Sequence, residues 1–253
     1  MRKQSSTSRD AETLRAVRIA LSSEPRLNLS LHPIGISLSD GDLILEGELP
    51  SLSMKKLALV RAAPVSGVDA IVDRLRVAPS RRMSDAEIRD GVCHALMQEP
   101  AFAEFVIRQR VKGRSELVRR GPGSPLGVIE CSVGDGVVTL DGDVPGLEHK
   151  RLAGVLAWWV PGSRDVVNGL GVSPPEEDSD DEITDAVRLA LEKDPFVNAS
   201  QIRVSCEEGT VTLDGLVTSD SEKEMAEQDA WYVFGVGSVI NRVLVEPTTP
   251  AAR

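Results

Sequence analysis

Long apolar runs, clusters of cysteine and a surplus of histidine are all missing from this chain of 253 residues. No stretch approaches the roughly 18 consecutive apolar residues that cross a bilayer. The three cysteines, Cys93, Cys131 and Cys206, are odd in number and widely spaced, which argues against a disulfide framework and against a metal knuckle. We therefore expect them to be free thiols in buried positions.

Groups that perform catalysis are equally scarce. The three histidines, His32, His94 and His149, occupy unrelated places in the repeated pattern described below. No serine stands in a nucleophile elbow, and no glycine-rich loop leads into a lysine that would cradle a phosphate. The sequence therefore predicts a binding protein rather than an enzyme, and it points to no cofactor and no metal ion.

The start of the chain, MRKQSSTSRDAETLRAV, is basic and then polar, and it lacks the apolar segment of a secretory signal. As written, the sequence predicts a cytoplasmic protein that reaches a membrane only peripherally. A periplasmic location would require an unrecognised export route or a different chain start.

What the chain does contain is one pattern stated three times. The segments GDLILEG, GVVTLDG and GTVTLDG begin at residues 41, 136 and 209, and a further glycine follows each segment at the same distance. The repeat glycines are Gly41, Gly47, Gly67, Gly136, Gly142, Gly162, Gly209, Gly215 and Gly235. Such a repeat indicates three copies of one small module rather than one large domain.

Each copy changes its apolar period in the same order. Apolar residues alternate before the first glycine and again after it, which predicts two strands joined by a tight turn. After the second glycine the apolar spacing becomes helical, and an alternating strand ends the copy. Another helical pattern precedes each hairpin and stops at an acid–proline pair, at 24–25, 99–100 and 194–195.

We therefore predict an α+β protein of three tandem αββαβ modules, each a three-stranded sheet with two helices on one face. The modules span 10–78, 84–173 and 180–246, with flexible tails at 1–9 and 247–253. The segment SPPEEDSDDE, residues 173–182, is rich in proline and acid, so it should be extended and should tether the third repeat loosely. Ser221 and Glu224 are a candidate capping box for the last helix.

The second repeat carries about 20 extra residues near 107–127, IRQRVKGRSELVRRGPGSPLG. We expect a flexible basic loop that contacts an anionic lipid surface, or else the acidic third repeat of the same or a neighbouring chain. Nucleic acid is disfavoured as a target because no aromatic residue interleaves the arginines. The basic residues of this insertion are Arg108, Arg110, Lys112, Arg114, Arg119 and Arg120.

The net charge of −10 belongs to one end of the chain. Residues 176–253 hold 18 acidic and 6 basic side chains, whereas the first two repeats are close to neutral. Such an acidic region repels the phosphates of nucleic acid. It also offers a basic partner an electrostatic target, which favours a self-associating scaffold as the alternative to lipid binding.

Two of the eight aromatic residues, Trp158 and Trp231, occupy the same position in their repeats. On a helical wheel this position points away from the sheet, so the indoles should form a contact surface. Three kinds of contact are open to them: between modules, with a partner protein, or with a lipid interface.

Acidic residues stand beside the repeat glycines in every copy. Glu46, Asp141 and Asp214 precede the second glycine. Asp40, Asp135 and Glu208 precede the first. Turn formation explains these acids without a ligand, and the alternative is a small-ion sensor that binds a cation through carboxylates and carbonyls.

Taken together, these motifs resemble the BON domain of bacterial osmotically inducible and envelope proteins. The resemblance lies in V-x-L-x-G, then A-x-x-x-A with a glycine–valine break, then V-x-N-x-L-x-V. The third copy carries it through Val211–Gly215, Gly235-Val236 and Val239-Ile240-Asn241. The resemblance implies the αββαβ fold, and it implies binding to phospholipid surfaces or other partners in an envelope or stress context.

Overall fold

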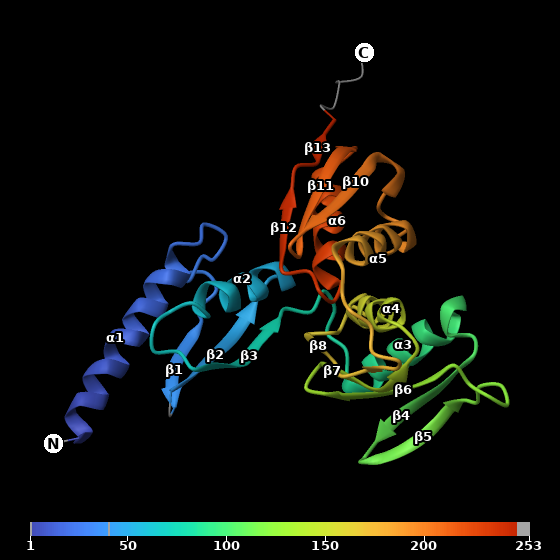
Figure 1. The fold of residues 1–253 in the computed structure, drawn as a ribbon, viewed down its shortest axis with the longest axis horizontal. Coiled ribbons are helices and arrows are strands. Elements are labelled where there is room, and N and C mark those ends of the chain that lie inside the picture. The colour runs from blue at the N-terminus through green and yellow to red at the C-terminus, as the bar shows by residue number, and fades with distance from the viewer. Residues whose placement is uncertain (1, 40, 247–253) are drawn as a thin grey trace. The chain divides into compact units, whose positions relative to one another are not determined.

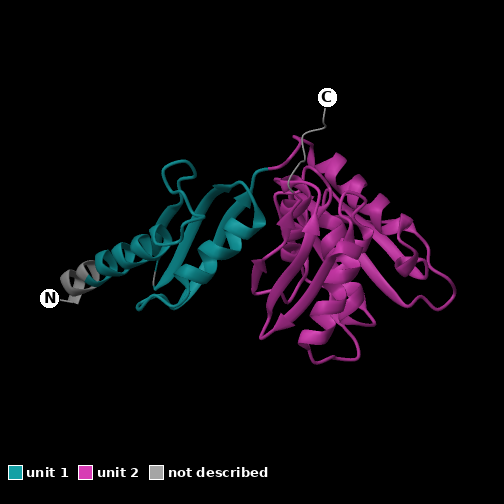
Figure 2. Ribbon diagram, turned by 90° about the horizontal axis from the view of Figure 1, so that it is seen from above, with its two compact units in different colours: residues 1–78 teal, residues 79–253 magenta. Residues whose placement is uncertain are grey.

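The computed structural model describes residues 2–39 and 41–246 of the chain. It divides into two compact units, residues 1–78 and residues 79–253 (Figure 2). The first unit is the first repeat, and the second unit holds the other two. No helix in the described residues is both long enough and apolar enough to cross a membrane. The predicted tail at 247–253 lies outside the described residues.

The first unit has the predicted order of elements (Figure 1). These are α1 (Arg2–Ser22), β1 (Gly35–Ser39), β2 (Asp42–Leu49), α2 (Leu52–Ala62) and β3 (Ala70–Val77). Strand β2 lies in the middle, antiparallel to β1 and parallel to β3. Helix α1 begins at Arg2, within the segment 1–9 for which the sequence predicts a flexible tail.

One buried cluster holds the helices of the first unit to its sheet. Val17 and Leu21 of α1 meet Leu43 and Leu45 of β2, and small residues of α2 complete the layer. The alternation along β2 explains this arrangement, since every second side chain of a strand points to the same face.

The second repeat opens the second unit. Its elements are α3 (Asp85–Gln98), the short helix η1 (Pro100–Phe102), β4 (Phe105–Val111), β5 (Arg114–Arg119), β6 (Gly127–Gly134), β7 (Val137–Val144), α4 (Leu147–Trp158), β8 (Asp165–Asn168) and β9 (Gly171–Val172). The sheet order is β5-β4-β6-β7-β8, and β9 continues the pairing with β7. The expected three-stranded sheet is therefore widened by β4 and β5, which come from the basic insertion.

The third repeat returns to the simple plan. Its elements are α5 (Asp180–Lys193), the short helix η2 (Ala199–Gln201), β10 (Ile202–Glu207), β11 (Thr210–Val217), α6 (Asp220–Tyr232), β12 (Ser238–Asn241) and β13 (Leu244–Val245). The order is β10-β11-β12, and β13 pairs with β11 beyond β12. All three repeats thus share the αββαβ fold that the sequence predicts.

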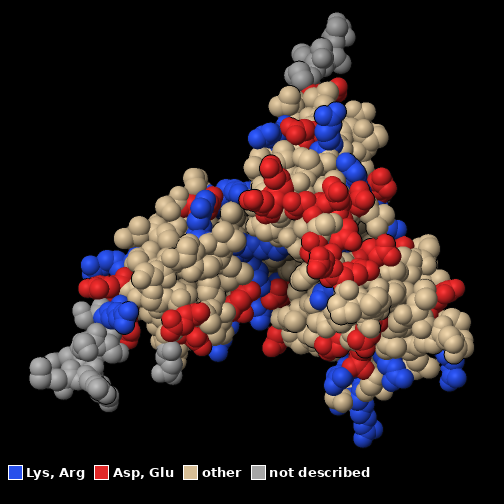
Figure 3. All heavy atoms as spheres, viewed as in Figure 1, with Lys and Arg blue, Asp and Glu red and all other residues tan. Residues whose placement is uncertain are grey.

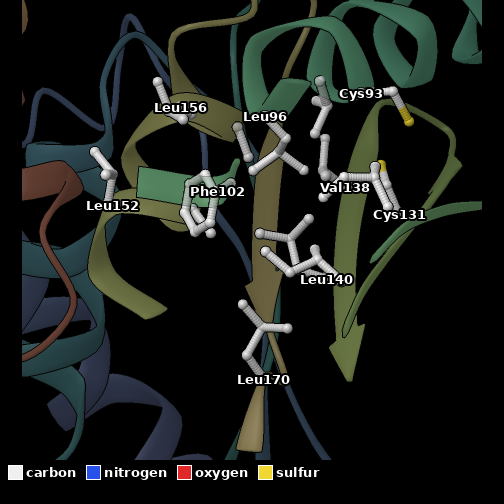
Figure 4. Close-up of a cluster of buried hydrophobic side chains, with 14 of the residues drawn as sticks. Cys93, Leu96, Phe102, Cys131, Val138, Leu140, Leu152, Leu156 and Leu170 are labelled. Carbon is white, nitrogen blue, oxygen red and sulfur yellow. The ribbon is translucent and has the colours of Figure 1, made fainter. Parts of the chain in front are cut away.

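The core of the second repeat lies between its helices and its sheet (Figure 4). Phe102 and Phe105 meet edge to face with ring centroids 5.2 Å apart. Cys93 and Cys131 are buried free thiols in this core, as predicted, and Cys206 is a half-buried free thiol in the third repeat. The hydrogen bond with Cys93, followed by burial, raises the pKa of Cys131 far above its ordinary range, so that thiol remains protonated and unreactive.

Backbone conformation or close packing requires glycine at several of the repeat positions. In the turns of the second and third repeats, an acidic residue and a glycine both have positive φ: 53° and 76° at Asp135 and Gly136, and 50° and 70° at Glu208 and Gly209. Two successive positive φ values define the type I′ hairpin turn. At Gly142 a Cβ atom would lie 2.1 Å from the carbonyl oxygen of Val128, so only glycine allows the two strands to approach there.

Candidate interaction surfaces

The basic insertion is an ordered hairpin, not the flexible loop that the sequence predicts. β4 and β5 pair antiparallel around Lys112 and Gly113, whose φ angles of 49° and 78° form a type I′ turn. β4 also pairs parallel with β6, which continues the sheet into the hairpin. Phe105 and Ile107 are fully buried, so these alternate residues anchor β4 to the core.

Two of the six predicted contact residues have structural roles. Arg119 donates hydrogen bonds to the carbonyl oxygens of Met97, Phe102 and Phe105, and so joins β5 to the end of α3 and to η1. Arg110 pairs with the carboxylate of Glu130 on β6, with 2.8 Å between its Nε and Oε1. Neither arginine is therefore free to bind an external anion as predicted.

Hydrogen bonds stabilise the charged form of Glu130 beneath the hairpin. The Ser115 hydroxyl, followed by the guanidinium of Arg110, holds the pKa of Glu130 below its ordinary value, although desolvation opposes this shift. The ion pair thus attaches one face of the hairpin to β6.

The other four basic residues are exposed. Among the residues that the structure describes, the side chains of Lys112, Arg114 and Arg120 make no hydrogen bond or ion pair. The side chain of Arg108 donates to the Ser115 hydroxyl at 3.4 Å, and its charge also favours the ionised form of Glu130. Arg108 is the cross-strand partner of Leu117, whose side chain is 48% exposed. We call this set the basic hairpin surface: Arg108, Lys112, Arg114, Leu117 and Arg120.

The two tryptophans do not form an exposed pair. Trp231 is fully buried, so of the three contacts open to it, a contact with a partner or with a lipid interface does not occur in this structure. The ring of Trp158 is stacked on Tyr232 of the third repeat, with centroids 5.4 Å apart and planes 9° from parallel. Trp158 therefore makes a contact between modules, which was one of the three contacts open to it.

Further contacts join the second and third repeats into one unit. Arg151 on α4 is buried, donates to the carbonyl oxygen of Phe234 at 3.0 Å and pairs with Asp178 in the linker. Lys193 at the end of α5 pairs with Glu99 at the end of α3, at 2.8 Å. The linker is thus fixed at both repeats, and the expectation of a loosely tethered third repeat was wrong.

A buried acid lies at the same junction. Asp229 on α6 is 2% exposed, and its Oδ1 accepts a hydrogen bond from Nε1 of Trp159 at 2.8 Å. Its Oδ2 has no hydrogen-bond partner among the described residues. Burial raises the pKa of Asp229 to about 8, assisted by the neighbouring carboxyl group of Asp194.

A groove of about 330 Å³ lies between α4 and α5. We call it the α4–α5 groove. Apolar side chains of both helices line it, including Leu152, Val155 and Leu189, and Arg151 also contributes. Its carboxylates are Glu148, Glu176, Glu182 and Asp185. Acidic side chains gather over this part of the second unit in Figure 3.

Sequence reasoning missed this groove because it arises from the packing of two repeats. The sequence predicted that the linker with Glu176 and Asp178 would be extended and would tether the third repeat loosely. In the structure, Glu176 accepts from the backbone N–H of Leu147 at 2.7 Å and Asp178 pairs with Arg151. The available signal was Arg151 itself, a charged residue directly beside the apolar stripe of its helix.

The acids beside the glycines do not assemble a metal site. No group of three or more histidine, cysteine or acidic residues within 2–39 and 41–246 is placed to hold a metal ion. Asp135 and Glu208 instead occupy the positive-φ position of their turns. The backbone N–H groups of these turns donate to Asp85 in the second repeat and to Asp180 in the third. Asp40 lies outside the described residues.

Comparisons with known proteins agree with the repeat pattern. The BON domain matches three times, at residues 9–79, 106–174 and 179–247. No curated protein matches the chain. Two solved structures of CdsD, a structural protein of the Type III secretion system of Chlamydia trachomatis, are 15% and 16% identical.

The first CdsD structure, of the C-terminal domain, covers 92% of this chain and 97% of its own, and the second covers 94% and 93%. Both have a TM-score of 0.24, which is too low to support an argument about arrangement or function. The family assignment depends instead on the threefold match and on the αββαβ module seen in every repeat. The chain belongs to the BON domain family, with three tandem copies of the domain.

Proposed function

We propose that this protein is a non-enzymatic binding protein that contacts anionic phospholipid surfaces peripherally, in an envelope or stress setting, through the basic hairpin surface. The observation that carries the proposal is the exposure of four cations around one hairpin, three of which, Lys112, Arg114 and Arg120, have no anionic side-chain partner among the described residues. Two structural arginines and a buried strand hold that hairpin rigid, so little ordering cost accompanies binding.

The chemistry of the hairpin suits a headgroup layer. Each basic residue near an anionic membrane contributes about 1 kcal/mol, so four residues change vesicle binding about a thousandfold. Leu117 lies on the same face as Arg108 and adds an exposed apolar side chain that can enter the interface. Membership of the BON family supports the same class of target.

Vesicle flotation tests the proposal. The full chain is mixed with anionic or neutral vesicles at low and physiological salt, beside a variant that carries Arg108→Ser, Lys112→Ser, Arg114→Ser and Arg120→Ser. We expect the wild type to float with anionic vesicles alone, less at higher salt, and the variant to remain in solution.

A matched control removes the same charge elsewhere: Arg81→Ser, Arg82→Ser, Arg203→Ser and Arg242→Ser. All four of these arginines are exposed. This control should float as the wild type does. Equal flotation of the hairpin variant, or equal binding to neutral vesicles, would exclude the hairpin as the lipid contact.

A further inference from the structure

The α4–α5 groove has an apolar floor and an acidic rim. Some of the rim carboxylates cap helices, and others do not. Glu182 forms the capping box of α5 with Ser179, and Glu176 caps the start of α4 at Leu147. Glu148 and Asp185 cap no helix, and their side chains are 78% and 77% exposed. Glu148 lies 3.3 Å from Nδ1 of His149, and Asp185 forms a surface ion pair with Arg188 at 3.1 Å. The rim therefore presents carboxylates that a cationic partner can reach.

Arg151, the basic residue that lines the groove, does not neutralise this rim. Arg151 is buried beneath it, and its guanidinium is already bound to Asp178 and to the carbonyl oxygen of Phe234. An anionic headgroup would be repelled here, so the groove is not a second lipid site. A ligand with basic tips and a short apolar body matches the groove.

The size of the groove limits that ligand. The groove holds about 330 Å³, which is the scale of a few side chains. The narrow end of a β-hairpin matches this size, because two long side chains can enter while the strands stay outside. The basic hairpin surface supplies such an end, with Lys112 and Arg114 on either side of Gly113 and Val111 behind them.

We infer that the α4–α5 groove of one molecule receives the β4–β5 hairpin turn of a second copy of this chain, with Lys112 and Arg114 against Glu148 and Asp185. The hairpin turn lies across the second repeat from α5 (Figure 1), so a chain does not fill its own groove. Groove and hairpin are different surfaces, so the contact is head to tail and builds open chains or rings rather than a twofold dimer.

Charge reversal in solution, without lipid, tests this contact. The hairpin variant carries Lys112→Asp, which tolerates the positive φ, and Arg114→Glu. The groove variant carries Glu148→Lys and Asp185→Lys. Sedimentation velocity of the wild type should show mass that rises with concentration at about 0.1 M salt and falls at about 1 M, where the Debye length shrinks from about 10 Å to about 3 Å.

Each reversed variant should associate more than about tenfold more weakly, because like charges then face each other. A chain that carries all four reversals restores complementary charges and should associate again. A control with Glu192→Lys and Glu224→Lys, two exposed acids outside the groove, should behave as the wild type does.

A wild type that stays monomeric at all concentrations, or a four-reversal chain that fails to associate, would overturn the inference. Flotation separates this result from the proposed lipid contact. The groove variant keeps its basic hairpin surface and should still float with anionic vesicles, while the hairpin variant should lose both properties. Flotation that fails while association persists would reject the lipid contact alone.

Discussion

At the scale of single residues, Asp229 makes the second unit sensitive to pH. Burial raises its pKa to about 8 from the ordinary 3.8, so the native state holds a proton that the unfolded chain releases. The contribution of Asp229 to the free energy of unfolding is therefore complete below about pH 4, and it is lost as the pH rises to about 8. Trp159, Asp194 and Tyr232 surround this carboxyl group.

Asp229→Asn removes this dependence. The amide oxygen still accepts the hydrogen bond from Trp159, and no charge has to be buried. We expect the free energy of unfolding of the second unit to rise by up to roughly 4 kcal/mol at neutral pH and to vary less between pH 4 and 8. Urea unfolding followed by tryptophan fluorescence measures this, since Trp158, Trp159 and Trp231 all lie in the second unit. An unchanged slope of stability against pH would contradict the assignment.

Another residue-scale comparison explains why the first repeat departs from the BON pattern. Asn168 and Asn241 donate to the carbonyl oxygens of Lys150 and Lys223, at 2.7 and 3.0 Å. The first repeat has Asp73 at this position, and its carboxylate pairs with the ammonium group of Lys55, the residue equivalent to those lysines, at 3.0 Å. The two positions are therefore in contact in all three repeats. In the first repeat the contact is made by the side chain of the lysine, and in the other two by its backbone carbonyl oxygen.

At the scale of elements, Arg119 joins the hairpin to the end of α3 and to η1. Arg119→Ala leaves the carbonyl oxygens of Met97, Phe102 and Phe105 without this donor. We expect the second unit to lose about 2 kcal/mol of unfolding free energy. Arg120→Ala, a change in the neighbouring exposed residue, should cost almost nothing. Fluorescence-detected urea unfolding compares the two variants, and equal losses would reject the structural role of Arg119.

The insertion also covers a strand edge of the second repeat that a cation covers in the third repeat. In the third repeat, Arg188 donates to the carbonyl oxygen of Val204 on the edge strand β10, at 3.3 Å. The equivalent residue of the second repeat is Cys93, which is buried, and there β4 pairs with the equivalent strand β6. An exposed edge invites pairing with another chain, so a cation or an added strand serves the same protective purpose.

Sequence patterns predicted the elements wherever the signal was local. Alternation and the glycine turns gave the αββαβ order because both depend on neighbouring residues. The hairpin was missed because arginines occupy the outward positions of β4 and hide its period of two, although Lys112-Gly113 was an available turn signal. The last helix begins after Ser219 rather than Ser221, because Glu222 also binds the backbone N–H groups of Asn198 and Thr218.

At the scale of the whole molecule, no repeat pattern indicated that the second and third copies form one unit. Their junction depends on residues that are not shared among the repeats, such as Arg151, Trp159 and the linker acids. The six exposed or paired cations of the insertion likewise looked equivalent in the sequence, because only packing separates structural arginines from accessible ones. The α4–α5 groove therefore follows from how two repeats combine, and the basic hairpin surface follows from an insertion into one of them.

Arg151→Met tests that junction. The methionine keeps the apolar part of the side chain, but Asp178 and the carbonyl oxygen of Phe234 lose their shared donor. We expect a loss of about 2 kcal/mol from the second unit and faster cleavage of the linker at Glu176 and Glu177 by a glutamate-specific protease. Native cleavage rates measure this opening because a protease cuts only the transiently opened linker.

Lys223→Met is the matched control, since it also replaces a long cation on a helix of the same unit. Its cleavage rate and unfolding curve should follow those of the wild type. If Arg151→Met also behaves as the wild type, the stacking of Trp158 on Tyr232 and the pair of Lys193 with Glu99 suffice to hold the repeats together. If the linker opens only in Arg151→Met, one buried guanidinium fixes the position of α5 against α4, and with it the groove that a second copy would bind.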